Sequence, residues 1–247
     1  MSRPADGTVA SAAPHRTGVD AVGRFVFRFR DYLAPCGLAV ALVVTHPEHP
    51  FGSPTVNLGT DVVGVLVACL GQALRVAVIG YAYIVRGGSN RQLAAPQLVC
   101  RGFYAHCRNP MYTGNFLLLA GLAIIYNSRW VYALVLPLFY AALLAIVRAE
   151  ERFLAAKFGG EYDDYCRRVN RFVPHLRGLG ATLAPMTFDW RRVLRKEYGT
   201  TFAWVSAALF LLIWERLYHF GYPAAATPIP LLAAAYVPLV AAWATVR

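Results

Sequence analysis

Charged residues are scarce in this chain of 247 residues, and acidic residues are the scarcer kind. Only 15% of the residues are charged, with 13 Asp and Glu against 24 Lys and Arg, whereas 57% are hydrophobic and the mean hydropathy is +0.44. A soluble globular domain has about half apolar and about a quarter charged residues. The composition therefore excludes an ordinary soluble domain and indicates a polytopic membrane protein.

Cysteine is also sparse, and its spacing excludes two kinds of site. The five cysteines are Cys36, Cys69, Cys100, Cys107 and Cys166. Their number is odd and none forms a CxxC pair, which argues against a disulfide framework and favours reduced thiols facing the cytosol or lipid. We expect no metal site. The C-terminal "WATVR" has no prenylation box, so we do not expect the chain to be a prenylated substrate itself.

Long apolar stretches are the main feature that is present. A membrane-spanning helix needs roughly 20 mostly apolar residues. Six stretches are candidates: Tyr32–Thr45, Val62–Ile84, Tyr112–Tyr126, Trp130–Val147, Thr200–Leu217 and Ile229–Val246. The first begins after 31 residues and no small-residue cleavage site follows it, so we interpret it as a retained span and not as a signal peptide. The fold class predicted is all-α, with about six transmembrane helices and a cytoplasmic cofactor-binding segment.

The distribution of Lys and Arg predicts the orientation. With both termini in the cytoplasm, 21 of the 24 cations fall on the cytoplasmic side, as expected from the positive-inside rule. The net charge of +11 is then explained by the orientation of the chain in the membrane, where cytoplasmic cations can also contact anionic lipid headgroups. Nucleic-acid binding is not needed to explain it. We expect residues 1–24 to be a disordered cytoplasmic N-terminus, residues 25–199 to be the core with four spans, and residues 200–247 to be two additional spans.

A first polar constellation lies directly before the third span, in "RGFYAHCRNPMYTGN". Asn109 followed by Pro110 is typical of a helix start, with free amides and the positive end of the helix dipole at the membrane surface. Arg108 offers a planar fork of donors to a carboxylate. The residues that add ring faces and polar tips are Tyr104, His106 and Tyr112. The alternative is that they are interfacial anchors beside an ordinary helix cap.

A second constellation begins at the end of the fourth span. Glu150 and Glu151 lie where a helix dipole favours cations, so an exposed acidic pair there needs another reason, such as binding a cation. After the break at Gly159-Gly160, Tyr162 and Tyr165 share a helix face with Val169. The alternative for this second helix is an amphipathic helix on the membrane surface. For its charged residues Asp163, Asp164, Arg167 and Arg168 we favour that solvated face.

The three residues between the third and fourth spans bring the two constellations together. So short a connection makes the spans antiparallel neighbours, which places "YAHCRNPMY" and "RAEE" at the same membrane depth. An arginine for an anionic group, carboxylates for a cationic group and tyrosine rings suit a zwitterionic, cationic cofactor with an aromatic base. S-adenosylmethionine fits this description, although these properties alone do not single it out.

The two motifs "GFYAHCRNPMYTGN" and "EERFLAAKFGGEYDDYCRRVNRFVP" resemble the C-terminal region of the superfamily of isoprenylcysteine carboxyl methyltransferases and phospholipid methyltransferases. The resemblance covers about 75 residues. Its matching positions are Gly102, Tyr104, Arg108, Asn109, Pro110, Tyr112 and Gly114, then Glu150, Glu151 and Leu154, then Phe158, Gly159, Tyr162 and Tyr165, and finally Pro174.

This resemblance implies a membrane-embedded enzyme that binds S-adenosylmethionine on the cytoplasmic side and takes a lipophilic acceptor from the bilayer. The implied cofactor-binding residues are Tyr104, His106, Arg108, Asn109, Pro110, Tyr112, Glu150, Glu151, Tyr162 and Tyr165. The chain departs from the prenylcysteine enzymes at Asn109, where they have histidine. It also continues for two spans beyond the motif, which we expect to shape an acceptor groove.

The catalytic candidates are Arg108, Glu150 and Glu151. A carboxylate or thiolate acceptor needs no strong base, whereas an amine must first lose a proton, which one of the glutamates could take. Arg75 lies within the second span beside Gln72 and is expected to face the bundle interior. There it could contact an acceptor headgroup, a glutamate or an internal structural partner.

Two other functions are compatible with the sequence. One is an NADPH-dependent enzyme of the sterol-reductase type, which has a motif similar to "KFGGEYDDY" nearer its chain end. The other is a membrane scaffold that keeps the fold without turnover, since fold does not fix chemistry.

Overall fold

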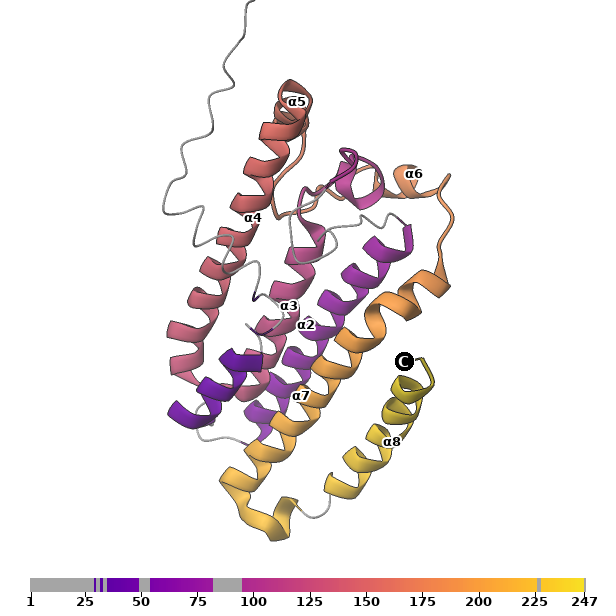
Figure 1. Ribbon diagram of the computed structural model, residues 1–247. Coiled ribbons are helices and arrows are strands. Elements are labelled where there is room, and N and C mark those ends of the chain that lie inside the picture. The colour runs from indigo at the N-terminus through magenta and orange to yellow at the C-terminus, as the bar shows by residue number, and fades with distance from the viewer. Residues whose placement is uncertain are drawn as a thin grey trace, which may run out of the picture.

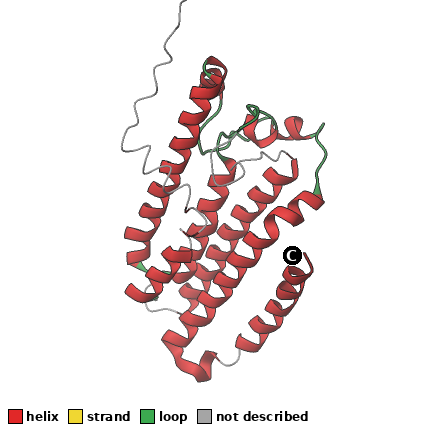
Figure 2. Cartoon of the chain, in the orientation of Figure 1, coloured by secondary structure: helices red, strands yellow, loops and turns green. Residues whose placement is uncertain are grey.

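The computed structural model describes residues 29, 32, 35–48, 54–81, 95–225 and 228–246. The predicted disordered segment 1–24 lies outside these residues, as do Arg86 and Arg91 of the loop between the second and third spans. Within the described ranges the regular structure is helical, and no strand is present (Figure 2). This confirms the all-α class.

Six apolar helices lie at the six positions predicted from the sequence. Three are long enough to cross a membrane: Thr55–Tyr81, Val131–Phe158 and Trp190–His219. Three are shorter: Pro35–Val44, Pro110–Tyr126 and Tyr236–Thr245. Their lengths and composition confirm a polytopic helical membrane protein.

The helix boundaries differ from the predicted ones mainly at polar ends. The elements are α2 (Pro54–Tyr81), η3 (Gly102–Ala105), α3 (Pro110–Tyr126), the π-helical η4 (Val131–Val135), α4 (Leu136–Phe158), α5 (Gly160–Arg168), α6 (Leu179–Leu183), α7 (Trp190–Ala225) and α8 (Pro228–Val246). α2 begins eight residues and α7 ten residues before the predicted apolar stretch, because hydropathy does not detect polar helical turns.

The helices form one bundle with the polar segments at one end (Figure 1). α2, α3 and α7 run side by side, and α4 lies along α3. η3, α5 and α6 lie at the end where α3 begins and α4 ends, at the top of Figure 1. α8 packs against α7.

α2 and α3 pack with unusually close backbones along a line of glycines. A Cβ atom added at Gly71 would lie 2.8 Å from the carbonyl oxygen of Gly114, and one added at Gly121 would lie 2.5 Å from the carbonyl oxygen of Gly64. Small residues allow this approach in membrane helices, where packing and not the hydrophobic effect drives association. The close approach fixes the start of α3 against α2.

The predicted hairpin between the third and fourth spans is confirmed. α3 ends at Tyr126, and the left-handed conformation of the following residue, Asn127 (φ 47°), turns the chain. The returning helix widens into a π turn at η4, directly before Pro137. Proline cannot donate a backbone hydrogen bond and its ring crowds the preceding turn, so a wider turn at this point accommodates it. Tyr112 of α3 then packs against Leu143, Ile146 and Val147 of α4.

Candidate active site

The N-terminus of α3 is fixed by an extended segment from later in the chain. The backbone N–H of Arg108 donates to the carbonyl of Asn170 over 2.8 Å, and that of Asn109 donates to Arg171 over 3.1 Å. α3 starts at Pro110 as predicted, but the Asn109 side chain does not cap it. Its amide instead donates to Glu151 Oε1 and to the Arg171 carbonyl, each over 3.2 Å. The residue expected to cap the helix therefore connects three segments.

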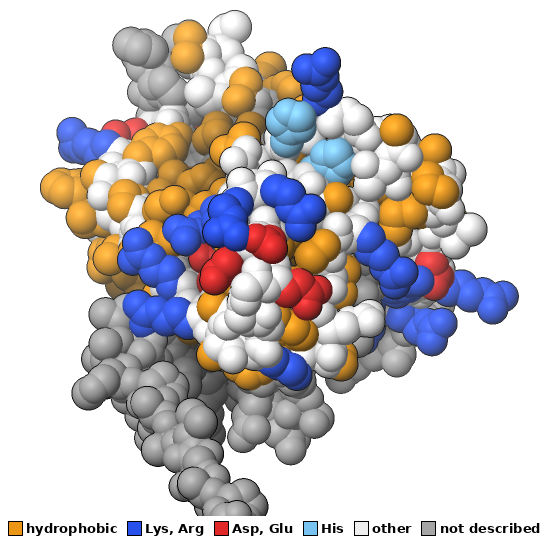
Figure 3. Space-filling view, turned by 90° about the horizontal axis from the view of Figure 1, so that it is seen from above, with side chains coloured by type: hydrophobic (Ala, Val, Ile, Leu, Met, Phe, Trp, Pro, Cys, Tyr) orange, Lys and Arg blue, Asp and Glu red, His pale blue; other side chains and the backbone are white. Residues whose placement is uncertain are grey.

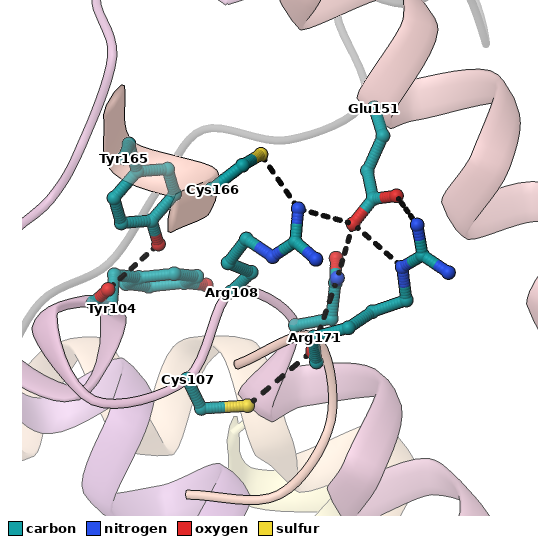
Figure 4. Close-up of polar contacts among 8 residues, drawn as sticks. Tyr104, Cys107, Arg108, Glu151, Tyr165, Cys166 and Arg171 are labelled. Carbon is teal, nitrogen blue, oxygen red and sulfur yellow. Dashed lines mark hydrogen bonds and ion pairs between the residues drawn. The ribbon is translucent and has the colours of Figure 1, made fainter. Parts of the chain in front are cut away.

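Glu151 lies between two arginines (Figure 4). Arg108 Nη1 is 3.5 Å from Glu151 Oε1 and donates to Cys166 Sγ over 2.6 Å. Arg171 holds both carboxylate oxygens, with Nη2 2.9 Å from Oε2 and Nε 3.2 Å from Oε1. Burial lowers the pKa of Arg108, but Glu151 and Cys166 outweigh burial and raise that pKa above its ordinary value. The guanidinium therefore stays charged.

Glu150 belongs to the same site but has a different partner. Tyr112 donates its hydroxyl to Glu150 Oε1 over 2.6 Å. Glu150 and Glu151 are only 6% and 9% exposed, so they are not the exposed acidic pair considered above. A buried carboxylate requires hydrogen bonds or a cation. Tyr112 of α3 supplies the hydrogen bond to Glu150, and Arg108 and Arg171, which both lie outside α3, supply the cations at Glu151.

Arg108, Asn109, Glu150, Glu151 and Arg171 form a polar cluster, and the tyrosines of α5 lie on one side of it. Tyr162, Tyr165 and Val169 form a buried face, as their spacing predicted. Tyr165 donates its hydroxyl to the carbonyl of Tyr104 over 2.7 Å, which ties α5 to η3. Burial, with the charge of Glu151 as a second cause, raises the pKa of Tyr162 well above its ordinary value. Tyr162 therefore remains a neutral hydroxyl.

His106 points to a different neighbourhood. Its Nδ1 lies 2.6 Å from the carbonyl of His175 and its Nε2 lies 2.8 Å from Thr182 Oγ1. Because a carbonyl only accepts, Nδ1 carries the proton. These contacts tie the loop to α6 and do not bring His106 to Glu151. Its role in cofactor binding stays a prediction.

Arg75 lies at the polar end of an apolar cavity. It forms a fork with Glu197 of α7, with Nη2 2.6 Å from Oε1 and Nε 2.9 Å from Oε2. It also donates to Asn115 of α3 and, over 3.3 Å, to Thr200. From the sequence, a glutamate and an internal structural partner are two separate possibilities for Arg75. Glu197 is both.

The cavity has a volume of about 830 Å³ and lies within the bundle. Its apolar walls come from the helix Pro35–Val44, α2, α3, the η4–α4 helix and α7. Arg75, Glu197, Tyr104 and Tyr112 line it together with Asn115. Tyr112 therefore contacts Glu150 and also faces the cavity.

Sequence reasoning missed several residues of this region. Arg171 lies outside any periodic pattern, and only the backbone pairing of residues 170–171 with residues 108–109 brings it to Glu151. Cys166 had been placed among the unremarkable cysteines. Glu197 precedes the predicted fifth span, so no hydropathy signal linked it to Arg75. For Arg171 a weak signal exists, because it lies within the second matching motif.

The site end of the bundle is rich in cations. In the view onto this end, Lys and Arg side chains surround a small group of acidic side chains, with histidine side chains nearby (Figure 3). Among the described residues, no group of three or more His, Cys, Asp and Glu is placed to hold a metal ion. The arrangement is suited to holding a small molecule with both charge signs.

Comparisons with known proteins relate part of this chain to membrane methyltransferases. The phospholipid methyltransferase family matches residues 60–161, which run from α2 to the start of α5. The protein-S-isoprenylcysteine O-methyltransferase of Schizosaccharomyces pombe is 30% identical over 114 residues, which are 43% of this chain and 46% of that protein.

Two bacterial metal-resistance proteins are also similar. The nickel-cobalt-cadmium resistance protein NccN of Alcaligenes xylosoxydans xylosoxydans is 36% identical over 80 residues, 32% of this chain and 37% of that protein. The cobalt-zinc-cadmium resistance protein CzcN of Cupriavidus metallidurans is 39% identical over 79 residues, 32% of this chain and 36% of that protein.

The matches thus span about a third to a half of these relatives' lengths. No solved structure matches the chain at a significant level. The family match includes the residues from the start of α3 to the end of α4, which supply Tyr112, Glu150 and Glu151 of the site. Through the family match over residues 60–161 and the partial match to the isoprenylcysteine enzyme, the chain is thus similar to the superfamily of membrane methyltransferases that contains the isoprenylcysteine carboxyl methyltransferases and the phospholipid methyltransferases.

Proposed function

We propose that this protein is an integral membrane methyltransferase that uses S-adenosylmethionine and acts on a lipophilic acceptor at the cytoplasmic face. The observation that carries this proposal is the position of Tyr112. Its hydroxyl binds Glu150 in the polar cluster, and the same side chain lines the apolar cavity. A site for a charged cofactor and a space for a lipophile thus meet at one residue.

The residues around Glu151 fit the charges of S-adenosylmethionine. Arg108 would hold the carboxylate, because a guanidinium binds carboxylates through two parallel hydrogen bonds. Glu150 and Glu151 would hold the ammonium. The rings of Tyr104, Tyr162 and Tyr165 would face the sulfonium and the adenine, since aromatic rings attract cations by about 0.5–2 kcal/mol. The bound cofactor supplies an activated methyl group.

The contribution of the protein is mainly orientation, which can supply roughly 7–11 kcal/mol of a barrier. Tyr112 holds Glu150 in place at the cavity wall. For a carboxylate or thiolate acceptor no proton has to move. For an amine acceptor, Glu150 Oε1 would be a candidate to receive the proton through the hydroxyl of Tyr112, which lines the cavity and is hydrogen-bonded to Glu150.

The acceptor would enter from the bilayer into the cavity. A volume of about 830 Å³ lies within the range of roughly 300–1,000 Å³ typical of small-molecule sites. Its walls come from five helices and are mainly apolar, so they suit an acyl or isoprenoid chain. Arg75 and Glu197 at the polar end would contact the headgroup.

Ligand titration tests this function against its two rivals. We expect the purified protein to bind S-adenosylhomocysteine and not NADPH, whereas a reductase would bind NADPH and a scaffold neither. Labelled methyl should pass from S-adenosylmethionine into total membrane lipid, and the labelled species identifies the acceptor.

Two variants test the site itself. Arg108→Ala and Glu151→Gln should each abolish binding of S-adenosylhomocysteine while the protein remains folded in detergent. The control is Arg167→Ala, which removes an exposed arginine of α5 whose side chain is 72% exposed. Undiminished binding in both site variants would refute the assignment.

A further inference from the structure

Arg171 is bound more completely to Glu151 than Arg108 is. It makes contacts of 2.9 Å and 3.2 Å with the two carboxylate oxygens, whereas Arg108 is 3.5 Å from one of them. The side chain of Arg171 is nevertheless 40% exposed and that of Arg108 only 13%. The stronger contact is thus made by the arginine with easier access to water.

The backbone of Arg171 does not depend on this side-chain contact. Its carbonyl accepts hydrogen bonds from the backbone and the side-chain amide of Asn109. The carbonyl of Phe172 accepts from Thr113 Oγ1 over 2.8 Å. The segment can therefore stay on α3 while the guanidinium moves.

The oxygens of Glu151 already have their donors. Oε1 accepts from Asn109 and Arg171 and lies near Arg108, and Oε2 is taken by Arg171. A carboxylate offers about four lone-pair sites. Oε1 is therefore filled, whereas Oε2 keeps one lone-pair site beside Arg171. A further cation at that site would lie against the Arg171 guanidinium, and like charges so close together repel each other. The further cation therefore binds Glu151 most strongly when one of the cations already present leaves. Arg171 can leave most easily, because its charge passes into water and not into the protein interior.

We infer that Arg171 is a resident counter-ion of Glu151, which the ammonium group of the cofactor displaces on binding. This inference rests on the proposed function. Without a ligand, Arg171 neutralises a carboxylate that is only 9% exposed and would otherwise be costly to bury. With the ligand, the ammonium takes over that role. The contact therefore stabilises the ligand-free protein and lowers its affinity for the cofactor.

Equilibrium binding tests the inference. We expect Arg171→Ala to bind S-adenosylhomocysteine more tightly than the wild type, with a Kd roughly two- to fivefold lower, the range expected for a half-exposed ion pair. Arg171→Lys keeps a cation but loses the fork, and should lie between the two. 5′-Methylthioadenosine lacks the ammonium and carboxylate, so its Kd should be the same for all three proteins.

Thermal unfolding provides a second readout. Without ligand, Arg171→Ala should have a lower Tm than the wild type. With saturating S-adenosylhomocysteine the two Tm values should converge, because the contact is absent from both complexes. A merely structural role for Arg171 would lower both values.

Several results would overturn the inference. Weaker S-adenosylhomocysteine binding by both variants would mean that Arg171 orients Glu151 and stays in place. An equal change with 5′-methylthioadenosine would place the effect away from the ammonium. If the wild type binds 5′-methylthioadenosine and S-adenosylhomocysteine but Arg171→Ala gains nothing, only this inference fails. If the wild type binds neither compound, the proposed function fails with it.

Discussion

Tyr112 and Glu150 form a 2.6 Å hydrogen bond that joins the first turn of α3 to the end of α4. The two residues are 38 positions apart and are brought together by the antiparallel hairpin. Both are buried, at 7% and 6% exposure. The bond thus holds the acidic group next to a residue that lines the cavity.

Removing this hydroxyl should affect both stability and turnover. We expect Tyr112→Phe to lose about 1–3 kcal/mol of unfolding free energy, because a buried acceptor loses its donor. Methyl transfer should fall as well, since Glu150 is no longer held at the cavity. Denaturant unfolding in detergent and a methyl-transfer assay measure the two effects. Tyr140→Phe is the matched control, as Tyr140 is 43% exposed; equal effects of both changes would contradict the prediction.

The glycine line between α2 and α3 should tolerate no side chain. A Cβ at Gly121 would lie 2.5 Å from a backbone oxygen and 2.6 Å from a backbone nitrogen of α2. Gly121→Ala should therefore cost about 1–3 kcal/mol through overpacking and lower the Tm. At Gly59, which lies in α2, the same change meets no atom within 4 Å, and alanine should raise the Tm slightly because it favours the helix. Similar Tm shifts for both variants would argue against the close contact.

The pair of Arg75 and Glu197 should behave as a buried ion pair. Arg75→Met leaves the carboxylate of Glu197, 3% exposed, without its main partner, and should cost about 3–5 kcal/mol. The double variant Arg75→Met/Glu197→Leu should recover much of this loss, because no buried charge remains. A double-mutant cycle from unfolding curves measures the coupling. The exposed Asp164–Arg167 pair of α5 is the control and should show little coupling.

The raised pKa of Tyr162 predicts a loss of stability in alkali. In the unfolded chain this phenol ionises near pH 10, whereas burial and Glu151 keep it protonated in the folded protein. Above about pH 10 the unfolded state therefore binds fewer protons than the folded state, and stability falls as pH rises. Tyr162→Phe should flatten this decline between about pH 10 and 11.5. Parallel curves of Tm against pH for the two proteins would contradict the prediction.

Much of the site could be foreseen from local signals. Asn109 and Pro110 marked the start of α3, and the short turn after Tyr126 made α3 and α4 neighbours. The Tyr162, Tyr165 and Val169 face followed from helical spacing. These features depend on residues close in sequence, so local sequence patterns are enough to predict them.

Other parts of the site could not be foreseen. Arg171 reaches Glu151 through backbone pairing between segments about 60 residues apart. Glu197 reaches Arg75 across 122 positions. His106 lies next to the cluster in sequence but turns toward His175 and Thr182. The partner that a charged side chain contacts depends on residues that are distant in the sequence.

The sequence by itself determined that the chain is an all-α membrane protein, where its apolar helices lie, and which polar motifs stand at their ends, because apolar length and helix punctuation are local properties. Only the tertiary structure decided how the charges are paired, how closely α2 and α3 approach, and that Tyr112 faces both the polar cluster and the cavity. Those outcomes depend on packing between distant segments, where a buried charge takes the partner that the fold brings within reach.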